Sequence, residues 1–117
     1  MFLDYSKLDG LFVICGTTDL RKGIDGLAAI VQYEYNLDVY QNALFIFCGR
    51  RSDRFKMLYY DQNGFLLLYK RLDQGKLRWP RKKEEIRQLT HQQLRWLMEG
   101  LDINQPRAIK PGKKGVF

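Results

Sequence analysis

Basic and aromatic side chains alternate through the centre of the chain, and together they have the chemistry of a nucleic-acid-binding surface. Residues 50–83 carry eleven Lys or Arg side chains against three Asp. Cations neutralise phosphates, and exposed rings can stack on bases. Most rings of a small sheet protein are core residues, so we assign the rings to the core and only the charges to an interface. These rings are Phe55, Tyr59, Tyr60, Phe65, Tyr69 and Trp79.

The charge of the chain is concentrated in this central segment. The formal net charge of the 117 residues is +7, made up of −3 over residues 1–49, +8 over 50–83 and +2 over 84–117. A local excess of this size favours a polyanionic partner, nucleic acid first and an acidic protein or a membrane surface second. The candidate DNA-binding residues are Arg21, Lys22, Arg50, Arg51, Arg54, Lys56, Lys70, Arg71, Arg78, Arg81, Lys82 and Lys83.

Two of these cations, Arg21 and Lys22, fall in the first turn of a predicted helix, where they oppose the helix dipole. One interpretation is a phosphate site, in which free N–H groups and both cations face one anion. The other is an ion pair with Asp19 or Asp25. The sequence leaves both open.

The sequence contains little that indicates a catalytic site. The single histidine, His91, excludes a His-pair metal nuclease, and Cys15, Cys48 and His91 give at most three zinc ligands without a C-x-x-C spacing. Phosphate-binding loops and nucleophile motifs are absent. Three carboxylates that could form a two-metal site are explained more simply as a helix cap, a helix face and a hairpin turn: Asp19, Asp25 and Asp61. We therefore predict a protein without catalytic residues, metal or cofactor.

Length and hydrophobic pattern predict a cytoplasmic protein of one domain. A chain of 117 residues matches the usual domain size, and 45% hydrophobic residues allow a packed core. The two cysteines lie in apolar runs, which indicates buried, reduced thiols. Residues 1–10 hold no apolar run of signal-peptide length, and no stretch of about 18 apolar residues suggests a membrane span.

The elements expected to position the charges begin with a strand over 11–15 and a helix from Leu20 to about Tyr35, which ends at Asn36. Glycines inside that helix, Gly23 and Gly26, suggest a close approach to another backbone. Strands over 43–48, 54–60, 65–72 and 76–79 follow, and Asn63-Gly64 is a strong hairpin signal. They predict an antiparallel meander of four strands.

A helix follows the meander. Thr90 to Gln93 matches a capping box, and apolar residues continue at helical spacing to Leu101. Residues 84–89 are expected to form a separate short helical turn. The predicted fold is α+β: one domain over 1–103, with β-α, meander and helix in that order, and a flexible basic tail over 104–117.

Alternation along the central strands places charges and apolar residues on both faces. Arg54, Lys56 and Leu58 share one face of the first, and Arg71 falls with Leu67 and Tyr69 on the next. Neither face is cleanly polar. Such a sheet is either covered on both sides or pairs with a partner chain.

Several segments together resemble a known family. The run from Thr18 to Leu27 is similar to its N-terminal signature, and Leu44 to Arg51 with Lys56 is similar to its central one. Further matches follow in collinear order: Gly64-Phe65, Tyr69 to Leu72, Gly75, Trp79-Pro80 and Leu97 to Gly100. The chain resembles the small accessory protein, often called TnpB, of bacterial transposons of insertion sequence family sixty-six. This protein is unrelated to the RNA-guided nuclease of the same name.

The resemblance implies a protein encoded beside a separate DDE-type transposase, which assists DNA transposition without performing strand transfer. It carries over no catalytic residues. We expect the basic meander to bind DNA at the transposon ends. The alternative is an interaction module that docks the transposase through the apolar sheet without contacting DNA. A weaker third alternative is a metal-dependent nuclease. The sequence leaves the oligomeric state open, with a homo-oligomer as one alternative.

Overall fold

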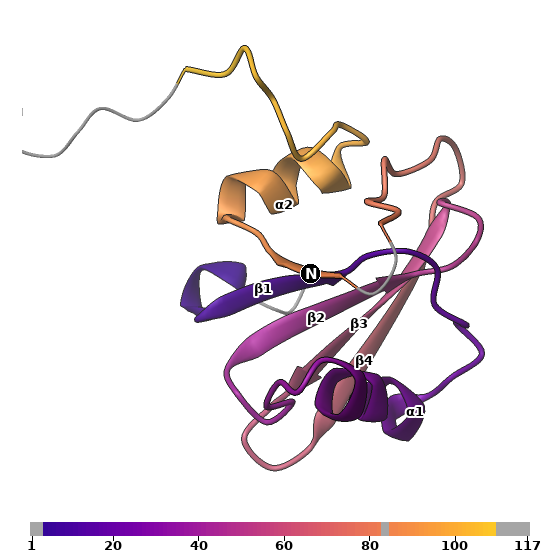
Figure 1. The fold of residues 1–117 in the computed structure, drawn as a ribbon, viewed down its shortest axis with the longest axis vertical. Helices are drawn as coiled ribbons and strands as arrows, with labels where there is room; N and C mark the ends of the chain where they lie inside the picture. Colours follow the sequence, from indigo (N-terminus) through magenta and orange to yellow (C-terminus); the bar gives the residue numbers. More distant parts are fainter. Residues whose placement is uncertain (1–3, 83–84, 110–117) are drawn as a thin grey trace, which may run out of the picture.

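A five-stranded mixed sheet forms the centre of the molecule (Figure 1). The computed structural model describes residues 4–82 and 85–109. The strand order is β4-β3-β2-β1-β5, and β1 and β2 are parallel while every other neighbouring pair is antiparallel. The strands are β1 (Gly10–Ile14), β2 (Ala43–Cys48), β3 (Arg54–Tyr60), β4 (Phe65–Arg71) and β5 (Ile86–Gln88).

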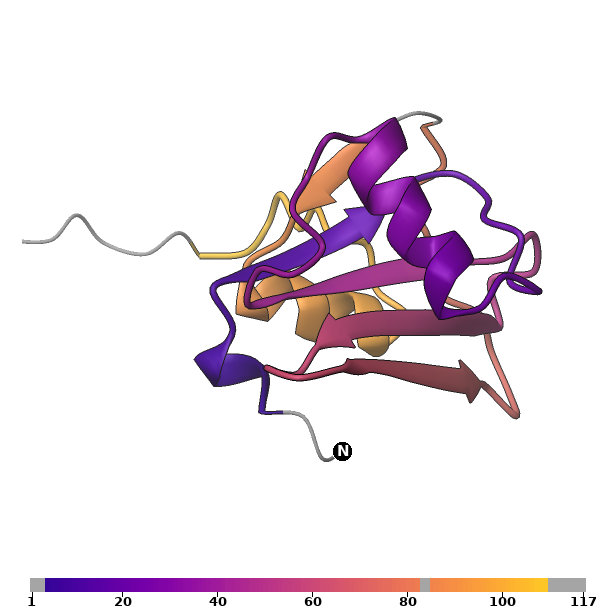
Figure 2. The ribbon, with the colours of Figure 1, turned by 90° about the horizontal axis from the view of Figure 1, so that it is seen from below.

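Helices cover both faces of this sheet, as Figures 1 and 2 show. A parallel pair of strands needs a crossover connection, and here it contains a helix. The helical elements are η1 (Tyr5–Lys7), α1 (Ile24–Ala29), its π-helical continuation η2 (Ile30–Glu34) and α2 (His91–Met98). The sheet is therefore covered on both sides, which is one of the two arrangements that the alternation predicted.

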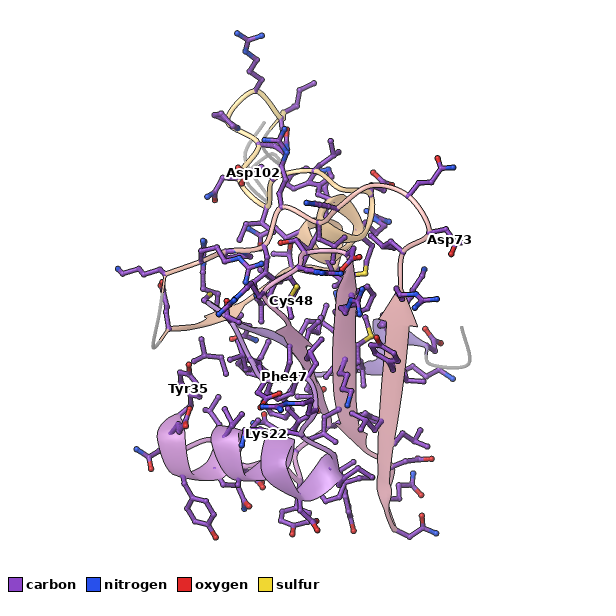
Figure 3. All side chains as sticks on the ribbon, turned by 90° about the vertical axis from the view of Figure 1, so that its right-hand side faces the viewer. Lys22, Tyr35, Phe47, Cys48, Asp73 and Asp102 are labelled. Atoms are coloured by element: carbon purple, nitrogen blue, oxygen red, sulfur yellow. The ribbon has the colours of Figure 1, made fainter. Side chains whose placement is uncertain are left out.

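Two apolar clusters hold the layers together. On the α1 side, Leu27 and Val31 are buried with Phe45 and Phe47. On the α2 side, Leu94 and Leu97 belong to one cluster with Ile46, Met57 and Cys48. Figure 3 shows Phe47 on the α1 side and its neighbour Cys48 toward α2, as alternation along a strand requires. All six residues of β2 are buried, because this strand is covered on both faces.

Much of the predicted fold is confirmed. The class is α+β, and the hairpin at Asn63-Gly64 joins β3 to β4. The capping box is present: the Thr90 hydroxyl accepts from the Gln93 N–H at 3.1 Å, and the Gln93 side chain accepts from the Thr90 N–H at 2.9 Å. Asn36 follows η2 with φ of 53°, which marks the predicted helix end.

The predicted strand over 76–79 is wrong. This segment is not part of the sheet; the Leu77 N–H donates to the Ser52 carbonyl in the β2–β3 turn at 2.7 Å. Leu77 and Trp79 are buried in the α2-side cluster, and Arg78 between them is exposed. The alternation of apolar and charged residues thus reflects an extended segment with one buried side, and this segment does not pair with a strand of the sheet. The antiparallel meander has three strands, β2 to β4.

The predicted helical turn over 84–89 is also wrong. Residues 86–88 form β5, which pairs antiparallel with β1 at the sheet edge opposite β4. Leu89 continues the pairing, because its N–H donates to the Leu11 carbonyl at 2.7 Å. A three-residue strand has too few residues to show a period, and its partner lies more than 70 residues earlier in the chain.

The first helix is shorter than predicted. It begins at Ile24, its N-cap is Gly23, and no side chain caps it. Arg21 and Lys22 therefore precede the helix instead of forming its first turn. The glycines mark no close backbone approach: a Cβ on Gly23 would meet nothing within 4 Å, and the atoms nearest to one on Gly26 belong to the Lys22 side chain.

Candidate nucleic-acid interface

An open cleft of about 650 Å³ lies where the β1–α1 loop, the β2–β3 turn and the adjoining ends of β3 and β4 come together. Its charged lining consists of five cations and one carboxylate. The lining residues are Thr17, Thr18, Asp19, Leu20, Arg21, Gly49, Arg50, Arg51, Arg54, Lys56 and Tyr69. Side chains up to 52 residues apart in the chain thus share one positive surface, which we call the basic cleft.

The β3–β4 pairing fixes the floor of the basic cleft. Arg54 lies opposite Arg71, and Lys56 opposite Tyr69. Side chains directly opposite each other share a face, so these four lie on the α1 side of the sheet. Further along both strands this face is apolar and packs with α1. The charged residues therefore lie at the end of this face that α1 does not cover.

Hydrogen bonds fix the β1–α1 loop against one side of the cleft floor. The Lys56 ammonium donates to the Lys22 carbonyl at 3.0 Å. The Thr18 N–H donates to the Cys48 carbonyl at 2.9 Å, and Thr18 is buried. The loop is thus held against the end of β2, beside the β2–β3 turn.

Two of the cleft cations are paired with carboxylates. Arg21 forms an exposed, bidentate pair with Asp19 at 2.9 and 3.0 Å, and its hydrogen bonds lower the pKa of the Asp19 carboxyl to about 2. Arg54 pairs with Asp53 at 3.0 Å and lowers the pKa of that carboxyl. Of the two alternatives for Arg21, the structure contains the ion pair with Asp19.

The β2–β3 turn supplies cations of a different kind. Arg50 and Arg51 are exposed, and within the described part of the chain neither forms an ion pair. The pKa of the Asp53 carboxyl is lowered mainly by the hydrogen bond from Arg54 and further by the charge of Arg51, but none of the described carboxylates is in ion-pair contact with the two turn arginines. An incoming anion would meet these two side chains without first breaking a salt bridge.

Arg81 acts as a clamp behind the cleft. One guanidinium nitrogen donates to the Gly16 carbonyl and the Thr17 hydroxyl, both at 3.1 Å. The other donates to the Ser52 hydroxyl at 2.6 Å and to the carbonyls of Gly49 and Arg50 at 3.1 and 3.3 Å. Its fork joins the β1–α1 loop to the β2–β3 turn. All these acceptors are neutral, so none of them offsets the charge of Arg81.

Other cations predicted to bind DNA do not line the basic cleft. Arg71 lies opposite Arg54 at the cleft edge, whereas Lys70 alternates onto the α2 side of β4. Arg78 lines a separate hollow with Trp79 and Asp102. Lys82 is exposed in the segment after Arg81, and Lys83 lies outside the described residues.

Tyr69 is the site residue that the sequence assigned wrongly. The rings as a group were assigned to the core, and Phe55 and Trp79 are indeed buried. Tyr69 is 55% exposed and lines the basic cleft, with the Lys56 ammonium 5.8 Å from its ring centroid. The signal was present in the alternation, because Tyr69 and Arg71 share a face.

Other reactive groups lie apart from the cleft. His91 is exposed at the start of α2, with Nε2 2.7 Å from the Tyr5 carbonyl oxygen. Among the described residues, no three His, Cys, Asp or Glu side chains gather as metal ligands would. No helix in this part of the chain is both long and apolar enough to cross a bilayer. Cys15 and Cys48 are buried free thiols, as predicted.

The Cys48 thiol makes stability depend on pH at alkaline values. Burial raises its pKa from 9.0 to about 11. A pKa raised by folding stabilises the native state fully below the unfolded value, and this contribution is lost as pH rises through the folded one. We expect the unfolding free energy of the wild type to fall relative to Cys48→Ala between about pH 9 and 11. Urea titrations at several pH values measure the difference; a constant difference would contradict the prediction.

A family model described as IS66 Orf2 like protein matches residues 9–108. The chain belongs to the IS66 Orf2-like family. Curated relatives of this family member include the uncharacterized proteins y4hO and y4jC of Sinorhizobium fredii. The first is 33% identical over 106 residues, covering 90% of this chain and 92% of its own length. The second is 32% identical over 107 residues, covering 90% and 91%. No solved structure matches the chain.

Membership confirms the resemblance found in the sequence. An IS66 Orf2-like protein is a transposon-associated accessory protein, and the family is not a known catalytic one. The matched range contains every residue of the basic cleft and its Arg81 clamp. The family setting suggests association with the transposase of the same element.

Proposed function

We propose that this IS66 Orf2-like protein assists transposition by binding DNA in the basic cleft. The observation that carries the proposal is the convergence of five cations from three separate segments on one hollow with a single carboxylate. Phosphate neutralisation is the main source of protein–DNA affinity, and arginine is suited to it by its planar, multidentate fork. Arg50 and Arg51 are the proposed primary phosphate contacts because, among the described residues, neither forms an ion pair with a carboxylate.

The alternative is docking of the transposase through the sheet without DNA contact. Both faces of the sheet are covered, by α1 and η2 on one side and α2 on the other. Most of the apolar surface that motivated this alternative is therefore internal, with Leu66 on β4, 44% exposed, as an exception. This favours DNA binding as the direct activity, with the transposase as a second partner in the same assembly.

Salt dependence of binding tests the proposal. Duplexes carrying the transposon end and duplexes of random sequence are titrated with the protein at several NaCl concentrations, using fluorescence anisotropy. Each neutralised phosphate contributes about −0.9 to the log–log slope, so three to five contacts predict a slope of roughly −3 to −4.5. A slope near zero, or retention of the transposase at high salt without any DNA binding, would reject it. Equal affinity for both duplexes would indicate backbone contacts alone.

A further inference from the structure

One aromatic ring in the basic cleft is placed where a ligand can reach it. Tyr69 is 55% exposed and is the one ring that lines this cleft. Tyr40, which is equally exposed, packs against Tyr60 and Phe65 with centroids 5.0 and 5.4 Å away. In the described residues no other ring packs on Tyr69; its ring contact is with the Lys56 ammonium. The Tyr69 hydroxyl also interacts with the Arg54 guanidinium, so the hydroxyl has a partner while no other ring of the described residues covers the faces of the Tyr69 ring.

The arrangement of ring and cations is that of a single-strand site. Arg21 comes from one wall, Arg50 and Arg51 come from the other, and Tyr69 lies on the floor beside Lys56. A backbone that follows the walls would turn its bases toward the floor. In a duplex the faces of the bases are covered by their neighbours, whereas an unpaired base can stack on an aromatic side chain.

The dimensions agree with this arrangement. A volume of about 650 Å³ falls within the roughly 300–1,000 Å³ typical of sites for small ligands. The volume of the cleft is thus sufficient for a nucleotide unit.

We propose that the basic cleft binds an unpaired stretch of DNA and stacks one base on Tyr69. This inference rests on the proposed DNA-binding function and specifies its substrate as single-stranded or frayed DNA. Lys56 lies beside the ring on the floor of the cleft, and Arg50 and Arg51 neutralise the adjoining phosphates. The stacking is sequence-tolerant, because every base has a π-face.

A comparison of Tyr69→Thr with Tyr69→Phe tests the inference. Threonine keeps the strand propensity and removes the ring, whereas phenylalanine keeps the ring. The matched control is Leu66→Thr, which removes an exposed large side chain from the same strand outside the cleft. Affinities for labelled dT12 and for a 12-base-pair duplex are measured by anisotropy at one salt concentration, and circular dichroism checks the fold of each variant.

We expect Tyr69→Thr to weaken dT12 binding by about 5- to 150-fold, the range that stacking of one base supplies. Leu66→Thr should stay near the wild type, and Tyr69→Phe, which keeps the ring but loses the hydroxyl beside Arg54, should recover most of the dT12 affinity that Tyr69→Thr loses. Duplex affinity should change less than about twofold in all three. Equal losses on both DNAs for Tyr69→Thr, or unchanged dT12 binding, would overturn the inference, and the duplex binding of the wild type would still support the proposed function. A wild type that binds neither DNA would overturn the proposed function as well.

Discussion

Replacing Arg50 and Arg51 together with glutamate is expected to weaken duplex binding by roughly 100- to 1,000-fold at low salt. The double reversal changes the cleft by four unit charges, each worth about 1 kcal/mol against a phosphate at contact distance in water. Every 1.4 kcal/mol is a factor of ten in affinity. Loss of two phosphate contacts should also make the salt slope shallower by about 1.8.

The fold should tolerate this double change. Both side chains are exposed, and the turn is held through backbone carbonyls, including that of Arg50, which accepts from Arg81. The matched control is Arg95→Glu with Arg107→Glu, which changes the net charge equally at two exposed arginines in α2 and the segment after it. If the control weakened binding as much as the Arg50 and Arg51 pair, net charge rather than the basic cleft would explain the effect. Thermal melts of both variants check that neither has unfolded.

Local pattern was sufficient for the parts of the fold that local contacts determine. The β3–β4 hairpin follows from two apolar strands around Asn63-Gly64, and the start of α2 follows from the capping box at Thr90. Even there the turn differs in detail. The residue with a positive φ is Gln62, at 55°, rather than the Asn-Gly pair that signalled the hairpin.

Non-local contacts determined the rest. Residues 76–79 alternate as a strand would, yet Leu77 and Trp79 pack under α2 and the segment bonds to a turn 25 residues earlier. β5 forms because β1 offers an open edge, which nothing within residues 86–88 can indicate. Burial on one side is visible in a sequence, but the partner that causes it is not.

The sequence predicted which residues form the candidate site better than it predicted what each of them does. Charge counting found four of the five cations of the basic cleft, because residues 50–83 keep an excess of +8 after their three Asp are counted, whereas Arg21 was found from its place at a predicted helix start. It could not separate Arg50 from Arg54, which differ by an Asp53 partner, or Lys70 from Arg71, which lie on opposite faces. It also could not show that the Arg81 guanidinium donates hydrogen bonds to five acceptor atoms.

Replacing Arg81 should therefore impair DNA binding even when the positive charge is kept. Arg81→Lys retains the charge, but a single ammonium cannot span the acceptors of the β1–α1 loop and the β2–β3 turn as the fork does. The carbonyls of Gly16 and Gly49, both buried residues, would lose a charged donor. We expect a loss of about 1–3 kcal/mol in unfolding free energy for Arg81→Lys and Arg81→Met alike.

The two Arg81 variants distinguish a clamp from a direct DNA contact. If Arg81 positions Arg50 and Arg51, both variants should lose affinity by about tenfold or more, because misplaced walls weaken several phosphate contacts at once. If it only contacts phosphate, Arg81→Lys should bind nearly as the wild type does and only Arg81→Met should fall. Arg78→Lys and Arg78→Met form the matched control, since Arg78 is exposed, lies three residues before Arg81 and lines a different hollow. Urea unfolding and anisotropy on the same preparations measure both effects. Hydrogen exchange at the Thr18 amide, which donates to the Cys48 carbonyl, would rise in both Arg81 variants if the loop is released.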